Sequence, residues 1–192
     1  MRMSSERRAE TRERILHSAM ALFRQHGVDA VGVDAIMHSA GLTHGGFYAH
    51  FDSKEALIAE AASASLARSA ARWERISQEN ERGAALARIV DSYLDEAHIA
   101  AGERGCVLTT LGPDVARRGV ARPAITASIR RMVDALAACT PGRRRRRALA
   151  ALSSMVGAVV LARLSDDADL AAELLAAARS VAGVGRSFPS RD

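Results

Sequence analysis

The segment from Gly32 to Lys54 is the feature that most constrains how this chain can fold. Its sequence, GVDAIMHSAGLTHGGFYAHFDSK, predicts two very short helices over residues 33–40 and 43–50, joined by a tight turn at Gly41. Helices of about two turns are not stable alone, because nucleation costs more than so few hydrogen bonds return. The surrounding chain must therefore hold the second helix in place, with Phe47 packed inward and one face left uncovered.

The uncovered face of the second helix carries small and polar residues. They are Thr43, His44, Gly46, Tyr48 and His50. In a helix-turn-helix, the second helix is presented in this way to the major groove of DNA. The segment therefore predicts a nucleic-acid-binding motif.

The charge of the chain permits nucleic-acid binding without demonstrating it. The 192 residues carry a net charge of +5, and their composition, 48% apolar and 26% charged, is that of a folded protein. Residues 1–54 are nearly neutral, with seven Lys and Arg against six Asp and Glu. Binding to phosphates must therefore depend on individually placed groups and helix N-termini.

Several classes of protein are not indicated by the sequence. The N-terminus lacks the apolar stretch of a secretory signal, and the longest apolar run, residues 155–162, is far below the ~20 residues that span a bilayer. Cys106 and Cys139 are too few for a disulfide framework or a zinc site, and the histidine spacing does not suit a metal centre. We find no P-loop, nucleophile elbow or HExxH motif. We therefore expect a cytoplasmic protein without membrane segment, metal or cofactor, and not an enzyme.

Hydrophobic periodicity predicts helices along the whole chain and no strands. The expected helices cover residues 4–26, 33–40, 43–50, 52–78, 84–101, an interrupted stretch over 106–118, 123–139, 143–164 and 167–182. We expect Ser4 or Ser5 to cap the first helix and Asp52 or Ser53 to cap the fourth. The fold class is therefore all-α, with about nine helices.

Residues 11–27 and 33–57 carry a dense, ordered set of family matches. Their sequences, TRERILHSAMALFRQHG and VDAIMHSAGLTHGGFYAHFDSKEAL, resemble the DNA-binding domain of the TetR/AcrR family of bacterial transcriptional regulators. Two departures matter. Gly32 stands where the family usually has a capping Thr or Ser, and Gly45-Gly46 stand where a side chain often reaches a base.

The resemblance implies a homodimer that binds double-stranded DNA at a roughly palindromic operator, usually as a repressor, and that a small-molecule effector releases. It predicts a helix-turn-helix DNA-binding domain over residues 1–52, a helical effector-binding and dimerisation domain over 53–186, and a flexible tail over 187–192. An alternative is a protein of this fold that acts chiefly through a protein partner.

The expected DNA contacts follow from the chemistry of the second helix and from the family match. A tyrosine hydroxyl and an imidazole can each donate to a phosphate oxygen. The candidates are Thr43, which we also expect to cap the helix, His44 as the base-reading side chain, Gly45, Gly46, Tyr48, His50 and Lys54. Tyr48 could instead pack between helices. The two glycines indicate either a tight fit between helices or a close approach of the backbone to the groove.

The candidate effector-binding residues are Trp73, Tyr93, His98, Cys106 and Met132. Each is also explained by an ordinary place in the core, where aromatic and Met side chains are common. Cys106 follows Gly105 at a predicted helix start, where the helix dipole and Arg104 favour a thiolate. It is therefore either a core residue or a sensor of oxidants or electrophiles.

The last two predicted helices, 143–164 and 167–182, form a hairpin with apolar residues on both members. Few elements remain in the chain to cover both faces of such a hairpin. Two copies would form an isologous four-helix interface, so we expect the homodimer to form through these helices.

Overall fold

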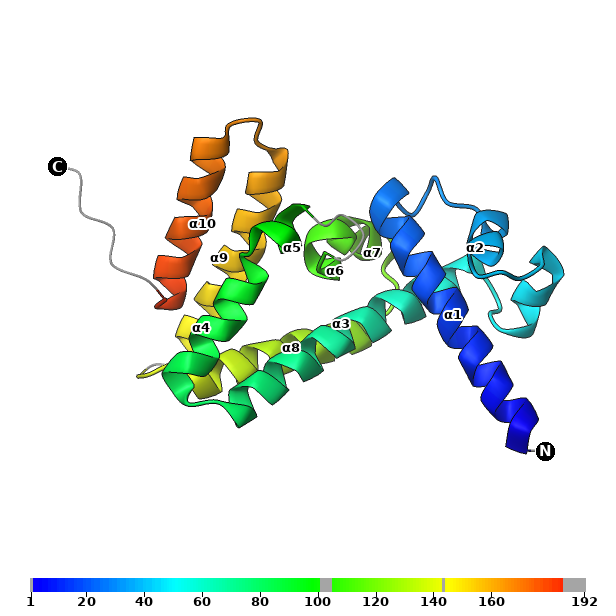
Figure 1. Cartoon of the computed structure of the whole chain (residues 1–192), viewed down its shortest axis with the longest axis horizontal. Helices are drawn as coiled ribbons and strands as arrows, with labels where there is room; N and C mark the ends of the chain where they lie inside the picture. The colour runs from blue at the N-terminus through cyan, green and yellow to red at the C-terminus, as the bar shows by residue number, and fades with distance from the viewer. Residues whose placement is uncertain (1, 101–104, 143, 185–192) are drawn as a thin grey trace. The chain divides into compact units, whose positions relative to one another are not determined.

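The computed structural model describes residues 2–100, 105–142 and 144–184, and every regular element within these ranges is a helix (Figure 1). This part of the chain forms ten α-helices and one 3-10 helix. The predicted all-α fold is confirmed, with slightly more helices than the sequence indicated.

The chain forms two compact units, residues 1–65 with 102–125, and residues 66–101 with 126–192. Unit 1 contains α1 (Arg2–His26), α2 (Val33–Ser39), the 3-10 helix η1 (His44–Ala49), α6 (Val107–Thr110) and α7 (Gly112–Arg118). Unit 2 contains α4 (Arg82–Tyr93), α5 (Glu96–Ala100), α9 (Arg144–Leu164) and α10 (Ala168–Ala182). Both α3 (Lys54–Glu79) and α8 (Arg122–Cys139) begin in unit 1 and continue into unit 2.

These compact units do not divide at residue 52, where the predicted domain boundary falls, because unit 1 also includes the first turns of α3 and the segment 102–125. The assignment of functions to residues 1–52 and 53–186 stays a prediction. The tail predicted over 187–192 lies outside the described residues.

Unit 1 is built on one apolar core to which α1, α2, η1 and the start of α3 all contribute. Phe23, Ile36, Phe47 and Leu57, one from each element, are at most 1% exposed. Burying a side chain of this size stabilises the folded state by about 1.5–3 kcal/mol. The core therefore holds α2 and η1, which are too short to persist alone.

The turn between α2 and η1 has the hydrogen bonds of a Schellman motif. Gly41 N–H donates to the His38 carbonyl (2.9 Å), and Leu42 N–H donates to the Met37 carbonyl (2.8 Å). Gly41 has φ +68°, a left-handed conformation that a side chain disfavours. The role predicted for Gly41 is confirmed.

The second helix of the motif is a 3-10 helix from His44 to Ala49, where the sequence predicted a longer helix over 43–50. Its bonds span three residues, as from Gly46 N–H to the Thr43 carbonyl (3.1 Å). Gly45 and Gly46 have low α-helix propensity, which gives a physical reason for the tighter geometry.

Two other predicted helix limits are corrected by the structure, and one predicted cap is confirmed. The first helix begins at Arg2, so Ser4 and Ser5 lie inside it and do not cap it. The helix predicted over 84–101 is divided into α4 and α5, because the chain leaves the helical conformation at Leu94 and Asp95. The cap of α3 is confirmed for Ser53, whose Oγ accepts from Ala56 N–H (3.0 Å).

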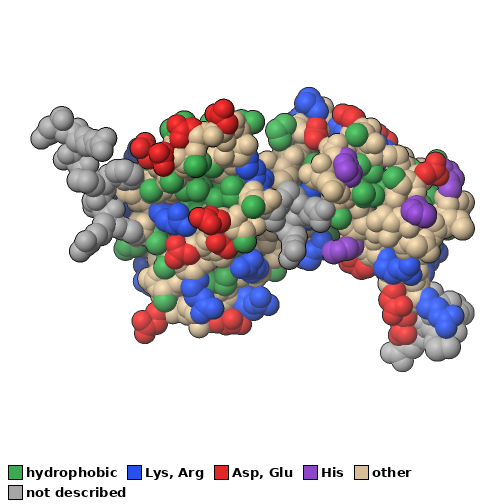
Figure 2. All heavy atoms as spheres, turned by 45° about the horizontal axis from the view of Figure 1, so that its top comes forward, with side chains coloured by type: hydrophobic (Ala, Val, Ile, Leu, Met, Phe, Trp, Pro, Cys, Tyr) green, Lys and Arg blue, Asp and Glu red, His purple; other side chains and the backbone are tan. Residues whose placement is uncertain are grey.

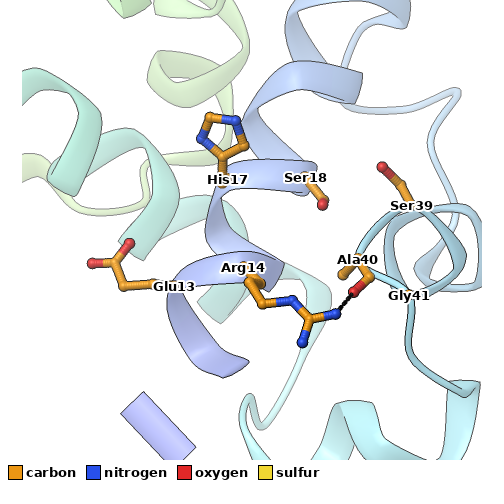
Figure 3. Close-up of a pocket in the computed structure, with 7 residues that line it drawn as sticks. All are labelled: Glu13, Arg14, His17, Ser18, Ser39, Ala40 and Gly41. Atoms are coloured by element: carbon orange, nitrogen blue, oxygen red, sulfur yellow. Dashed lines mark hydrogen bonds between the residues drawn. The ribbon is translucent and has the colours of Figure 1, made fainter. Parts of the chain in front are cut away.

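Three arginines of α1 donate to carbonyl oxygens at the ends of the two short helices. Arg14 donates to the Ala40 carbonyl, at the end of α2 (Figure 3). Arg8 donates to the Ala49 carbonyl (2.7 Å), and Arg12 donates to that of His50, both at the end of η1. The last carbonyls of a helix have no partner within it, and a cation there also interacts favourably with the helix dipole.

Arg12 makes the largest set of these contacts. Besides the His50 carbonyl, its guanidinium binds both carboxylate oxygens of Glu60 on α3, with Nε 2.9 Å from Oε1. Its Cζ also lies 4.1 Å from the centroid of the Phe51 ring, which allows a cation–π interaction. One side chain therefore links α1, the end of η1 and α3.

Unit 2 contains the predicted C-terminal hairpin, α9 and α10. Asp167 caps α10 by accepting from the N–H groups of Asp169 (2.9 Å) and Leu170 (3.0 Å), and Gly183 ends it with φ +82°. By length and mean hydropathy (1.5), α9 is the one described helix that could cross a membrane, a test that buried helices of soluble proteins also pass.

We expect Arg12→Met to lower the free energy of unfolding by about 1–3 kcal/mol, because the substitution leaves the Glu60 carboxylate and the His50 carbonyl without their charged donor. Urea unfolding followed by circular dichroism measures the difference. Arg7→Met, which removes an exposed arginine from the same helix, should change stability by less than about 0.5 kcal/mol. Equal losses in both variants would contradict the linking role of Arg12.

Candidate DNA interface

Tyr48 is the most exposed aromatic side chain of unit 1. It is 64% exposed, whereas the adjacent Phe47 is completely buried. The Tyr48 ring meets the Phe47 ring edge-on, with centroids 5.2 Å apart, and so stands on the core without entering it. This geometry favours the predicted DNA contact over the alternative of packing between helices.

His44 lies beside Tyr48 at the start of η1, with ring centroids 6.3 Å apart. Its Nδ1 is hydrogen-bonded to the carboxylate of Asp34, and both side chains are more than half exposed. The pair fixes the orientation of the His44 ring and leaves Nε2 outside this contact. Asp34 was not among the predicted site residues, since nothing in a separation of ten positions indicates the pair.

Thr43 occupies the cap position of η1, but its side chain makes no capping hydrogen bond. The predicted cap is therefore wrong. Its backbone is extended (ψ 153°), and the side chain is exposed. A DNA contact by the Thr43 hydroxyl stays a prediction.

The two glycines of η1 are not required by the packing of unit 1. A Cβ added to Gly45 would meet no atom within 4 Å, and one added to Gly46 would lie 3.5 Å from the Met37 side chain, an ordinary contact. The tight-fit alternative therefore has no support at Gly45. This favours the second prediction, a close approach of the backbone to the groove, which itself stays a prediction.

His50 is half-buried at the end of η1, and Lys54 begins α3 four residues later. The His50 Nδ1 atom is buried without a hydrogen-bond partner in the described part of the chain. Burial lowers the pKa of His50 below its ordinary value, and the charges of Arg8 and Arg12 lower it further.

A hollow of about 420 Å³ lies next to His50. Its lining residues are Arg7, Arg8, Thr11, Ala49 and His50. The sequence prediction did not include Arg7, Arg8 or Thr11, although their spacing of three and four residues places them on one face of α1. These side chains place guanidinium and hydroxyl donors beside the end of η1.

A second hollow, of about 590 Å³, lies between α1 and the end of α2 (Figure 3). It is lined by Glu13, Arg14, His17, Ser18, Ser39, Ala40 and Gly41. One carboxylate, that of Glu13, and one guanidinium, that of Arg14, belong to this lining, so their charges cancel. Figure 2 shows that the histidine side chains visible on this face of the molecule gather on unit 1.

Three of the five candidate effector-binding residues form a contact chain in unit 2. The rings of Trp73 and Tyr93 meet edge-on with centroids 5.6 Å apart, and those of Tyr93 and His98 lie 4.8 Å apart. Met132 is also buried in unit 2.

Cys106 belongs to unit 1, where it is 6% exposed and precedes the four-residue helix α6. Arg104, the predicted neighbour of this thiol, lies outside the described residues.

Known proteins match both the sequence of unit 1 and the fold of the chain. Residues 15–61 match the family model described as bacterial regulatory proteins of the tetR family. The regulator AcrR of Shigella flexneri is 39% identical over 59 residues, 31% of this chain and 27% of the relative. The regulator UidR of Escherichia coli K12 is 28% identical over 131 residues, 62% of this chain and 57% of the relative.

A solved structure, that of E. coli NemR in its reduced form, has a TM-score of 0.74 to this chain. The match covers 89% of this chain and 96% of the other at 20% sequence identity, so it shows a shared fold. The class defined by the fold and the motif is a helix-turn-helix regulator. The family model over residues 15–61 and the named relatives together support a transcriptional regulator of the TetR/AcrR family.

The lowered pKa of His50 predicts a loss of stability in acid. Below its ordinary value of 6.5 the unfolded chain binds a proton that the folded chain does not, so stability falls as the pH falls through this value. The loss of stability is complete once the pH lies below the pKa of His50 in the folded state. We expect His50→Gln to reduce this fall between about pH 7.5 and 5.5, measured by urea unfolding. His26→Gln, which replaces an exposed imidazole of α1, is the control, and an equal reduction in both variants would contradict the prediction.

Proposed function

We propose that this protein is a cytoplasmic, homodimeric transcriptional repressor that binds a roughly palindromic DNA operator through η1 and is released by a small-molecule effector. The observation that carries this proposal is the outward face of η1. There Tyr48 and His44 are exposed on an element whose buried side and final carbonyls are held by the core and by α1.

Placed donors would supply the phosphate contacts in this proposal. Residues 1–54 have almost no net charge, and Arg12 and Arg14 are already engaged inside unit 1. The remaining donors near η1 include the Tyr48 hydroxyl, Lys54, and Arg7 and Thr11 on α1. Such contacts orient the protein on the duplex, while His44 and the backbone at Gly45 would approach the bases.

The dimer is proposed to form through α9 and α10, as two copies of the same hairpin. Large apolar side chains on these helices are exposed, and Figure 2 shows hydrophobic side chains gathered over this part of unit 2. The most exposed are Leu149, Leu161, Leu164, Leu170 and Val181. A two-fold dimer would place its reading heads on half-sites about 34–36 Å apart.

The effector is proposed to bind near the contact chain of Trp73, Tyr93 and His98, with Met132 in the same unit. A thiol-reactive effector acting on Cys106 is a narrower version of this proposal. Since the Cys106 side chain is buried, such a reagent would reach it only when the segment around α6 opens. The alternative, action chiefly through a protein partner, predicts operator binding that no small molecule changes.

The proposal predicts sequence-specific retardation of the DNA upstream of the protein's own gene. Tyr48→Phe should weaken binding about 2- to 10-fold by removing one hydrogen-bond donor. Lys54→Gln should lower the slope of log affinity against log salt by about 1, because one phosphate contact is lost. The matched control is Arg130→Gln, which removes an exposed charge on α8. Binding to all DNA sequences with equal affinity would contradict the proposal.

The proposed dimer predicts that Leu161→Glu combined with Leu164→Glu produces a monomer. The two side chains are 50% and 78% exposed and lie three residues apart on one face of α9. Placing two carboxylates there would oppose burial against a second copy. Sedimentation velocity measures the mass, and Ala116→Glu, on the exposed face of α7, controls for added charge. A doubly substituted protein that remains dimeric would place the interface elsewhere.

A further inference from the structure

An arginine-lined hollow lies between the C-terminal part of α3 and α4, entirely within unit 2. Its volume is about 540 Å³, within the range of about 300–1,000 Å³ common for small-molecule sites. It is lined by Arg72, Arg75, Ile76, Glu79, Asn80, Arg88 and Ser92. None of these residues belongs to the predicted effector-binding set or to the proposed DNA interface.

Helical spacing directs these side chains toward one space. Arg72, Arg75 and Glu79 recur at intervals of three and four residues and share one face of α3. Arg88 and Ser92 are four residues apart on α4, and so lie on one face of that helix. The hollow therefore receives cations from two different helices.

Asn80, in the connection between the helices, fixes one of the guanidinium groups. Its amide nitrogen donates to the Ile76 carbonyl (2.9 Å), and its Oδ1 accepts from Nη1 of Arg88 (3.0 Å). The Arg88 guanidinium is therefore oriented before any ligand arrives. A donor that is already oriented loses less conformational freedom on binding.

The charges around the hollow are not balanced. Three guanidinium groups face a single carboxylate, that of Glu79. Within the described part of the chain, Arg72 and Arg75 form no ion pair, whereas Glu74, between them in sequence, is bound by Arg131 through two hydrogen bonds of 2.7 and 2.6 Å. The nearby acid is thus already paired, and two cations remain available.

We propose that this hollow is a binding site for a small anion carrying two or more phosphate or carboxylate groups. Guanidinium groups match these anions because each presents a planar fork of N–H donors to two oxygens. Ile76 is the one apolar lining residue, so the site suits a charged ligand better than a lipid-like one. The proposal does not depend on DNA binding, and its test uses no DNA.

His98 provides a reporter near the proposed site. Burial lowers its pKa, and the charges of Arg163 and Arg72 lower it further, against the opposing effects of the hydrogen bond with the Tyr93 carbonyl and of the Asp95 charge. An anion that offsets the charge of Arg72 should therefore raise the pKa of His98. This change can be followed by NMR titration of the imidazole, since His98 is the one histidine of unit 2.

The experiment is calorimetric titration of the full-length protein with pyrophosphate and, separately, with citrate, at a constant ionic strength of about 0.15 M. We expect saturable binding of at least one probe, with one site per chain. Arg75→Gln and Arg88→Gln should each weaken that binding at least about 10-fold, the effect of about 1.4 kcal/mol of lost interaction. Arg130→Gln, an exposed arginine of unit 2 outside the hollow, should leave binding unchanged.

The NMR titration separates a specific site from general attraction to a basic protein. At a probe concentration that just saturates the wild type, the probe should raise the pKa of His98 there and raise it much less in Arg75→Gln, where most sites stay empty. Circular dichroism establishes that each variant is folded. Absence of saturable binding for both probes, or equal weakening by Arg130→Gln, would overturn the proposal, while the proposed operator binding would be unaffected by either result.

Discussion

The contacts of the Arg12 guanidinium are the constraint on which the structure of unit 1 most depends. A two-turn α2 and a six-residue 3-10 helix have too few internal hydrogen bonds to define their own positions. Burial of Ile36 and Phe47 attaches them to the core, but apolar contacts are non-directional. The directional contacts come from Arg8, Arg12 and Arg14, which bind the carbonyl oxygens where each short element ends. Glu60 then links Arg12 to α3.

Arginine side chains can either bind groups inside the unit or attract DNA phosphates, and a count of charges does not distinguish these two roles. The seven cations and six anions of residues 1–54 suggest a weak electrostatic field, and the structure shows that some of these cations act inside the unit. An arginine that binds Glu60 and a carbonyl oxygen is a structural link, so it adds little to the attraction of DNA phosphates. The proposed interface therefore relies on few donors in fixed positions, a situation in which orientation contributes more to specificity than net charge does.

Much of the fold follows from local sequence signals. Apolar periodicity indicates the helices, and Gly41, Ser53 and Asp167 mark helix ends by mechanisms that act within a few residues. The contacts that define the sites join positions distant in sequence, such as Asp34 with His44 and Arg12 with Glu60, and no local pattern encodes them. The hollow between α3 and α4 is a similar case. The sequence around Asn80 indicates a helix break, whereas only the packing of the two helices reveals that Arg72, Arg75 and Arg88 face one space.

The Asp34–His44 pair bears on how the outward face of η1 could meet DNA. A carboxylate that is 82% exposed beside the recognition element would repel phosphate groups if it stood alone. Bonded to Nδ1, it instead fixes the ring of His44. Because the hydrogen bond uses Nδ1, Nε2 is the ring nitrogen that remains for a base edge or a phosphate oxygen. The direction from which His44 could meet DNA is thus determined by Asp34, a residue of α2 that contributes no base contact in the proposed interface.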